Sequence, residues 1–301
     1  MAGVMRTQDF RSIVEPILSE EFDGIYDLRK DEWKKIFRVE EGMKRAYHEE
    51  PVLYGMGAAP EIAEGAPVSY DQGGVLFINR VLYKVYGLAF ALTKVLVEDG
   101  DHIKIGQIFS RHLANSLIET KETITANMLN RAFNGSYVGG DGKKLIATDH
   151  PIVGGTFSNQ LTTQAALSQT SLEQLLIQLS TAVDNNGKRS RLVGVRIIVP
   201  PALRYVAEVL LKSSLKTGTN NNDINVLKGE LSDTAVVTRL TSSTAWFVQT
   251  DAQEGLKMLT RRALEKSMEG DFDSDNVRYK ATERYGVTWI DPRCLWGTPG
   301  L

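Results

Sequence analysis

The feature that most constrains the fold is one long helical pattern over residues 102–133. Apolar side chains recur there at helical spacing, and polar side chains fall on the opposite face. The expected apolar positions are Ile105, Ile108, Phe109, Leu113, Leu117, Ile124 and Met128, and the expected solvent-facing positions are Lys104, Gln107, Arg111, Asn115 and Glu122. At 1.5 Å per residue the helix would be about 48 Å long. A compact small domain does not need such a helix, so the pattern predicts the spine of an elongated molecule.

A second long element is expected near the carboxyl end. Apolar and polar residues alternate over residues 276–290, which predicts one continuous β-strand. Typical strands have about five or six residues, so this one would be an architectural element.

Residues 49–74 contrast with both, because they are rich in proline and glycine and contain no lysine or arginine. Five carboxylates lie there: Glu49, Glu50, Glu61, Glu64 and Asp71. Such a stretch predicts a long loop or a loose hairpin. Long loops in compact proteins are usually functional or disordered. The β-branched and aromatic residues of 75–91, which follow, predict strand.

The N-terminal 45 residues carry small apolar groups at helical spacing: Phe10, Ile13, Ile17 and Leu18, then Trp33, Ile36 and Phe37. These groups predict short amphipathic helices. Two interpretations stay open: a solvated helix pair, or an arm whose apolar patches pack on another subunit.

The middle of the chain predicts an α/β unit. Thr170–Glu173 has the form of a capping box that opens a helix, and residues 191–199 predict a strand. A helix should begin near Pro201, with Leu203, Val206, Val209 and Leu210 on its buried face. Strands are expected at 235–240 and 244–249.

Composition and motifs argue against most catalytic and binding chemistries. Thirty-five basic residues nearly balance 37 acidic ones, which excludes a strongly basic DNA-coating protein. A single cysteine, Cys294, excludes an intrachain disulfide and should be a small buried hydrophobe. His102 and His112 would lie on different faces of a helix, so they form no metal pair. The apolar residues 74–97 are interrupted by basic side chains, so no membrane span is expected.

Three short motifs have weak functional interpretations. Residues 139–144 (GGDGKK) lack the spacing and hydroxyl of a phosphate-binding loop, so a tight turn is the better interpretation. Asp149-His150 resembles a general base, but no nucleophile is placed beside it. Residues 188–191 (KRSR) could contact phosphates, although a solvated turn is favoured. We therefore expect no catalytic residue, no cofactor and no metal.

Several phrases, in their order along the chain, resemble the major capsid proteins of tailed bacteriophages, whose fold encapsulin shells share. The phrases are YGLAF (86–90), LNRAFN (129–134), GDGKKL (140–145), TDHP (148–151), GTFSN (155–159), VPPAL (199–203), DIN (223–225), AWF (245–247) and the strand within 275–291. The resemblance covers about residues 71–298.

The resemblance implies an α+β fold of the phage major-capsid type. Its expected parts are an N-terminal arm (1–45), an extended loop (46–79), a peripheral domain (80–186) with the spine helix (102–133), an axial α/β domain (187–253) and a peripheral return strand (254–301). It also implies a structural protein, not an enzyme, that is made in the host bacterial cytoplasm and assembles with itself into hexamers, pentamers and an icosahedral shell. That shell, the virion capsid, would enclose double-stranded DNA through weak non-specific contacts and carry a portal, with no membrane.

Two departures from the family pattern qualify these expectations. No lysine lies between Lys44 and Lys84, so covalent linkage through a loop lysine is not expected. The initiator Met leaves little room for a cleaved scaffolding segment, so a separate scaffolding or decoration protein is expected. The alternatives are an encapsulin shell holding cargo enzymes and, less favoured, a soluble α/β enzyme.

Charge segregation suggests how copies of the chain would meet. The acidic loop has no basic residue of its own, so its carboxylates should dock on a basic surface of a neighbouring subunit. The proposed intersubunit residues are Glu61, Glu64 and Asp71 on one copy and Arg261, Arg262, Arg278 and Lys280 on the other.

Overall fold

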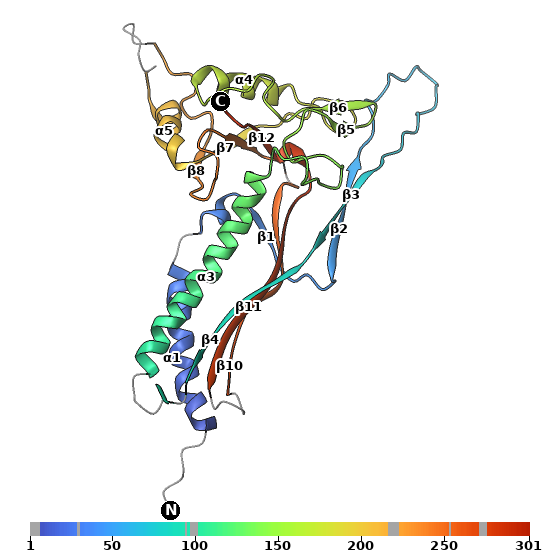
Figure 1. The fold of residues 1–301 in the computed structure, drawn as a ribbon. Coiled ribbons are helices and arrows are strands. Elements are labelled where there is room, and N and C mark those ends of the chain that lie inside the picture. The colour runs from blue at the N-terminus through green and yellow to red at the C-terminus, as the bar shows by residue number, and fades with distance from the viewer. Residues whose placement is uncertain are drawn as a thin grey trace, which may run out of the picture.

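The computed structural model describes residues 7–28, 31–93, 95–96, 102–215, 223–252, 254–270 and 276–301. The molecule has a long shaft of helices and strands that carries a broader α/β end, and a hairpin projects from the side of that end (Figure 1). This is the elongated α+β architecture that the long helix and the long strand predicted.

The shaft contains the predicted spine helix, α3 (His102–Asn130). It ends three residues earlier than expected because the chain turns at once, with the Asn134 amide donating to the Arg131 carbonyl. Leu113 and Leu117 are buried as predicted, but Ile108 is 44% exposed and Glu122 is buried. The predicted stripe is therefore partly wrong. A second helix lies along α3, where the Ser110 hydroxyl donates to the Leu18 carbonyl. Glu122 is buried because its carboxylate accepts a hydrogen bond from the Glu32 amide at 2.7 Å.

That second helix is α1 (Thr7–Leu28), one helix of 22 residues in place of the expected short ones. Its side chains Val14, Leu18 and Phe22 are buried against α3 of the same chain. A 3₁₀ turn at Trp33–Lys35 follows, and Trp33, Ile36 and Phe37 are buried in the main core. Most apolar groups of the described arm are therefore covered within their own subunit, whereas Leu28 is 80% exposed. Side chains before Val14, including Phe10 and Ile13, lie outside the description.

A four-stranded sheet forms the other side of the shaft, in the order β1 (Arg38–Glu40), β10 (Leu256–Gly270), β11 (Val277–Trp289) and β4 (Lys84–Leu92). β11 is the predicted long strand, and it pairs antiparallel with both β10 and β4. β10 has 15 residues and was not predicted. Most of its residues are good helix formers, and pairing along the whole of β11 overrides that preference.

The second sheet forms the broad end, in the order β12 (Leu295–Thr298), β9 (Trp246–Thr250), β7 (Gly194–Val199) and β8 (Asp233–Val236). Helices α4 (Gln169–Ser180) and α5 (Arg204–Lys212) belong to this end, and a 3₁₀ turn at Pro201–Leu203 precedes α5. The capping box of α4 is Ser168 with Ser171, two residues before the predicted one. On α5, Ala207 and Leu211 are buried while Val206 and Val209 are exposed. Leu203 and Leu210 pack against the core as predicted, so the predicted buried face was partly wrong.

The core of the broad end joins segments that lie far apart in the sequence. Leu172 and Leu175 of α4 and Trp296 of β12 share one core with Trp246 and Ile197 of the second sheet. The expected division into peripheral residues (80–186 and 254–301) and axial residues (187–253) stays a prediction.

The remaining strands form two hairpins. β2 (Tyr47–Tyr54) pairs with β3 (Gly74–Leu82), and β5 (His150–Ile152) pairs with β6 (Gly155–Phe157). A last 3₁₀ turn, Pro292–Cys294, holds the cysteine. Cys294 is buried as predicted, and burial raises the pKa of its thiol.

Candidate assembly surfaces

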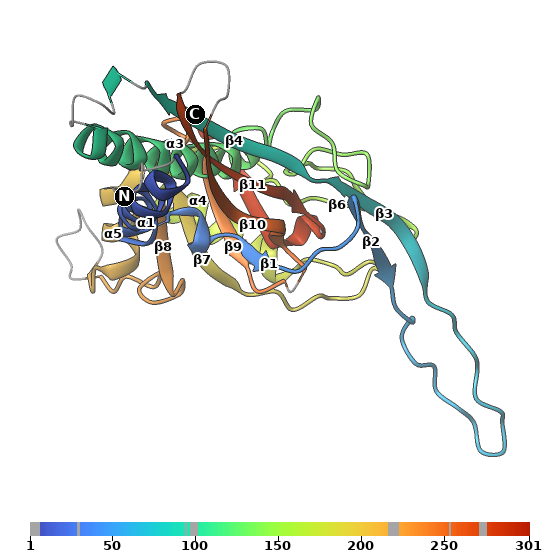
Figure 2. The same ribbon diagram turned by 90° about the horizontal axis from the view of Figure 1, so that it is seen from below.

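The most exposed part of the described chain is residues 55–73, which we call the hairpin loop. It extends away from the body beyond β2 and β3 (Figure 2). Glu61 and Glu64 are exposed and form no ion pair with a described residue. Tyr70 is 99% exposed, and Met56 and Val68 are also largely exposed. Large apolar side chains gathered on a projecting loop are typical of a surface that another molecule covers.

The base of the hairpin loop is held by its own chain. Asn185 donates to the Leu53 carbonyl at 2.8 Å, Asn186 donates to the Gly55 carbonyl, and the Lys188 ammonium donates to the Met56 carbonyl at 2.6 Å. Part of the predicted basic turn at 188–191 is therefore used to anchor the hairpin. Asp71 is also engaged locally, because it accepts a hydrogen bond from the Gly57 amide at 2.6 Å.

A buried lysine ties the hairpin strands to the shaft sheet. The Lys257 ammonium contacts Glu50 of β2 at 2.8 Å, Glu40 of β1 at 3.3 Å and Glu254 just before β10, while Lys257 itself is 3% exposed. Burial lowers the pKa of Lys257, but hydrogen bonds to Glu254 and Glu50 outweigh it and hold the pKa above its ordinary value. The bond from Lys257 is also the main cause of the lowered pKa of Glu254.

The four predicted basic partners lie on β10 and β11, far from the hairpin loop of their own chain (Figure 1). Arg262 pairs with Glu265 at 3.3 Å and donates to Thr282 at 3.1 Å. Arg278 also interacts within its own chain. Arg261 is partly buried, and Lys280 is exposed. One chain therefore does not bring these cations together with Glu61 and Glu64.

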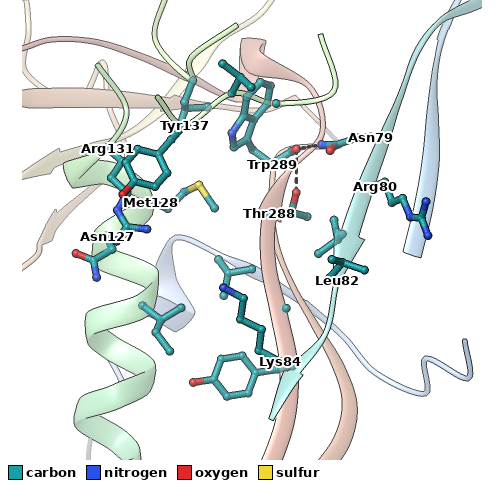
Figure 3. A pocket seen from close by; sticks show the side chains of 18 of the residues that line it. Asn79, Arg80, Leu82, Lys84, Asn127, Met128, Arg131, Tyr137, Thr288 and Trp289 are labelled. Atoms are coloured by element: carbon teal, nitrogen blue, oxygen red, sulfur yellow. Dashed lines mark hydrogen bonds between the residues drawn. The ribbon is translucent and has the colours of Figure 1, made fainter. Parts of the chain in front are cut away.

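A pocket of about 510 Å³, which the sequence did not predict, lies between the end of α3, the junction of β3 and β4, strand β11 and residues 136–139. Three basic residues line it, Arg80, Lys84 and Arg131, and none of the lining residues is acidic. Lys84 reaches into the space between α3 and β11, and Arg131 stands beside Tyr137 on the opposite wall (Figure 3). We call this site the basic pocket.

The cations of the basic pocket differ in their partners. Arg80 points away toward β2, where it lies 3.6 Å from Glu49 and over the ring of Tyr47. The Arg131 guanidinium lies 4.3 Å from the centre of the Tyr137 ring. Neither Lys84 nor Arg131 forms an ion pair with any described residue. The pocket therefore carries positive charge that no described residue neutralises.

Asp149 and His150, which resembled a general base, lie at a hydrogen-bonded cluster that we call the His150 cluster. His150 is fully buried, and its ring contacts Asp141 at 2.6 Å and Asn159 at 3.2 Å, while Asp149 pairs with Lys143 at the surface. Asn159 donates to the carbonyls of Leu145, Pro292 and Leu295. Among the described residues, His150 makes no hydrogen bond to a hydroxyl or a thiol. The geometry joins chain segments and offers no reacting group.

The glycine-rich stretch at 139–144, beside the His150 cluster, is a tight turn, as expected. The Gly139 amide donates to the Lys143 carbonyl, and Gly142 has a φ of 74°. A Cβ on Gly139 would lie 2.2 Å from the ring of Trp289, so the glycine is required by close packing. Within the described ranges, no cluster of histidine, cysteine or acidic side chains is arranged to hold a metal. No helix there combines the length and apolarity needed to cross a membrane.

Comparison with known proteins gives this architecture a family. The sequence matches the family described as "Phage capsid protein" over residues 82–297. No curated protein matches it. The fold resembles the capsid of the cyanophage P-SCSP1u, with a TM-score of 0.56, 11% identity, and 88% of this chain and 86% of that chain covered.

Two further capsid structures have a similar fold. The capsid protein of Myoviridae phage XM1 gives a TM-score of 0.54 at 10% identity, with all of both chains covered. The procapsid of bacteriophage JBD30 gives 0.52 at 13% identity, covering 97% of this chain and 76% of that one. At such identities these likenesses establish the fold, and the family match covers more than half of the chain. The chain therefore belongs to the phage capsid protein family and has the fold of a phage major capsid protein.

Proposed function

We propose that copies of this protein assemble into hexamers and pentamers that close an icosahedral shell around double-stranded phage DNA. The observation that carries this proposal is the hairpin loop. Its carboxylates Glu61 and Glu64 have no ion-pair partner among the described residues and its side chain Tyr70 is 99% exposed, which supports a role for the loop as a surface that another copy covers. We assign no reaction to the protein.

Other roles follow from membership of the family. As a virion component the protein would be made in the cytoplasm of the host bacterium. A portal and a separate scaffolding or decoration protein would complete the shell. Because the chain has a net charge of −2, contacts with packaged DNA would be weak and non-specific.

The contacts between copies would involve the predicted charges. Glu61 and Glu64 would meet cations of a neighbour, whereas Asp71 would mainly shape the loop. On the neighbour, Arg261, Arg262, Arg278 and Lys280 form one candidate surface along β10 and β11. Of these four, Lys280 is the one with an exposed ammonium and no ion pair to a described residue.

Assembly followed by light scattering tests the proposal. Replacing both Glu61 and Glu64 by glutamine should slow assembly or lower its yield while the subunit stays folded. Each exposed ion pair contributes only about 0–1 kcal/mol, but a shell repeats the contact at every equivalent interface. High salt should weaken wild-type assembly in the same way.

A matched control removes two charges elsewhere. Glu41 and Glu230 are exposed and lie outside the hairpin loop, so their double glutamine variant should assemble like wild type. If the loop variant also assembles like wild type, with the same dependence on salt, charge on the loop does not drive assembly.

A further inference from the structure

The basic pocket has an excess of positive charge, which is typical of an anion-binding site. Lys84 and Arg131 line it and form no ion pair within the described part of the chain, and no lining residue is acidic. Two cations that face one space repel each other unless an anion lies between them. The site therefore favours a ligand that brings negative charge.

The pocket is also partly apolar, which narrows the class of ligand. Ile124, Met128 and Leu145 line it beside the ring of Trp289. A free inorganic anion would leave these groups without a partner. A ligand with carboxylates on either side of an apolar side chain would satisfy both the cations and the apolar wall.

The hairpin loop contains such a segment, Glu61-Ile62-Ala63-Glu64. Both carboxylates are exposed, and Ile62 between them is about half exposed. A turn shapes the segment, since the Ala66 amide donates to the Ala63 carbonyl at 3.0 Å and Gly65 has a φ of 81°. The turn presents Glu64 at its edge.

The loop of the same chain is not placed to fill the pocket. Asn185, Asn186 and Lys188 hold its base, and the loop runs outward from there, away from the shaft (Figure 2). The basic pocket lies on the shaft side, between α3 and β11. The occupant must therefore come from another molecule.

We infer that the basic pocket of one copy receives residues 61–64 of the hairpin loop of a second copy. The carboxylates of Glu61 and Glu64 pair with Lys84 and Arg131, and Ile62 packs on Met128. The inference rests on the proposed function, and it names the receptor for the loop: the pocket, in place of the cations on β10 and β11.

Disulfide trapping tests this assignment. A variant with Ile62→Cys and Asn127→Cys places one thiol on the loop and one at the pocket, where Asn127 is a lining residue. Native Cys294 is buried and does not compete. Mild oxidation of assembled particles should link most subunits into dimers and longer chains on a non-reducing denaturing gel. Dissociated subunits should give only monomer.

Two comparison variants make the result specific. Ile62→Cys with Gln174→Cys, an exposed residue of α4, should give no linked species. Ile62→Cys with Lys280→Cys tests the competing surface. If particles form and residue 62 links to residue 280 and not to residue 127, the pocket assignment is overturned while the proposed function stands. If wild-type protein forms no particles at all, the proposed function itself fails.

A charge reversal covers the case in which the cysteine variant does not assemble. Glu64→Lys alone should reduce assembly yield at least tenfold, because it brings a third cation to Lys84 and Arg131. Adding Arg131→Glu to the same chain should restore most of the yield, since every copy then carries both reversed partners. Failure of the second change to restore assembly, with the subunit still folded, would overturn the inference. Rescue by Lys280→Glu instead would do the same.

Discussion

Replacing Leu117 by alanine should destabilise the unassembled subunit by about 2–5 kcal/mol. Leu117 is 2% exposed on α3 and packs in a core with Leu18 and Phe22 of α1 and Tyr279 of β11. Removing the carbons beyond Cβ loses about 2–2.5 kcal/mol of transfer free energy, at about 0.8 kcal/mol per buried carbon. The cavity adds to this loss, because two helices and a sheet enclose the site and cannot collapse onto it.

Ile108→Ala is the matched control on the same helix. The sequence pattern places Ile108 and Leu117 on one apolar stripe, yet Ile108 is 44% exposed. Its replacement should cost less than about 1 kcal/mol, partly offset by the better helix propensity of alanine. Urea unfolding of dilute, unassembled subunits, followed by circular dichroism and tryptophan fluorescence, measures both losses. Equal losses in the two variants, with unchanged m-values, would refute the packing described for α3.

Three further predictions concern buried charge and the nature of the interfaces. Lys257→Met should lower the free energy of urea unfolding by about 3 kcal/mol at neutral pH, because three carboxylates lose the buried ammonium that they contact. The pKa of Glu254 is depressed in the folded state, so the stability from this contact is present above its ordinary value of 4.5 and is lost as pH falls below it. The gap between wild type and Lys257→Met should therefore shrink between about pH 5 and pH 3, and a constant gap would contradict the assignment. His150→Phe should cost about 1–3 kcal/mol, since it removes the ring nitrogen that lies 2.6 Å from the buried Asp141 carboxylate. Asp149→Asn at the surface should cost less than about 1 kcal/mol in the same urea unfolding assay. Mature particles should give one band near 33.4 kDa on a denaturing gel, because the hairpin loop contains no lysine, and a ladder of covalent oligomers would show that the interfaces are not purely non-covalent.

The long elements could be predicted from sequence because their periodicity extends over many residues. The spine helix and β11 each carry a repeat that a short element cannot sustain, and both are present within a few residues of the expected bounds. β10 could not be predicted, since Leu, Lys, Arg, Glu and Met favour a helix. Only its pairing with β11 along the shaft makes it a strand.

The acidic half of the candidate interface was also visible in the sequence, because its charges are contiguous. Its receptor was not, because Lys84 and Arg131 are 47 positions apart and meet only where β4 and α3 face each other across the basic pocket. The Lys257 cluster has the same character, since Glu40, Glu50 and Glu254 come from separate segments. Sites made by tertiary contact leave no local pattern to read.

Cryo-electron microscopy of the purified wild-type protein under assembly conditions tests whether the chain forms a capsid shell. We expect closed icosahedral shells of hexamers and pentamers, in which the hairpin loop of each subunit lies on its neighbour. Particles recovered from infected cells should contain nuclease-protected DNA, whereas packaged protein cargo would indicate an encapsulin. Small discrete oligomers that persist at every concentration and salt condition, with the hairpin loop uncovered, would show that the protein does not form a shell.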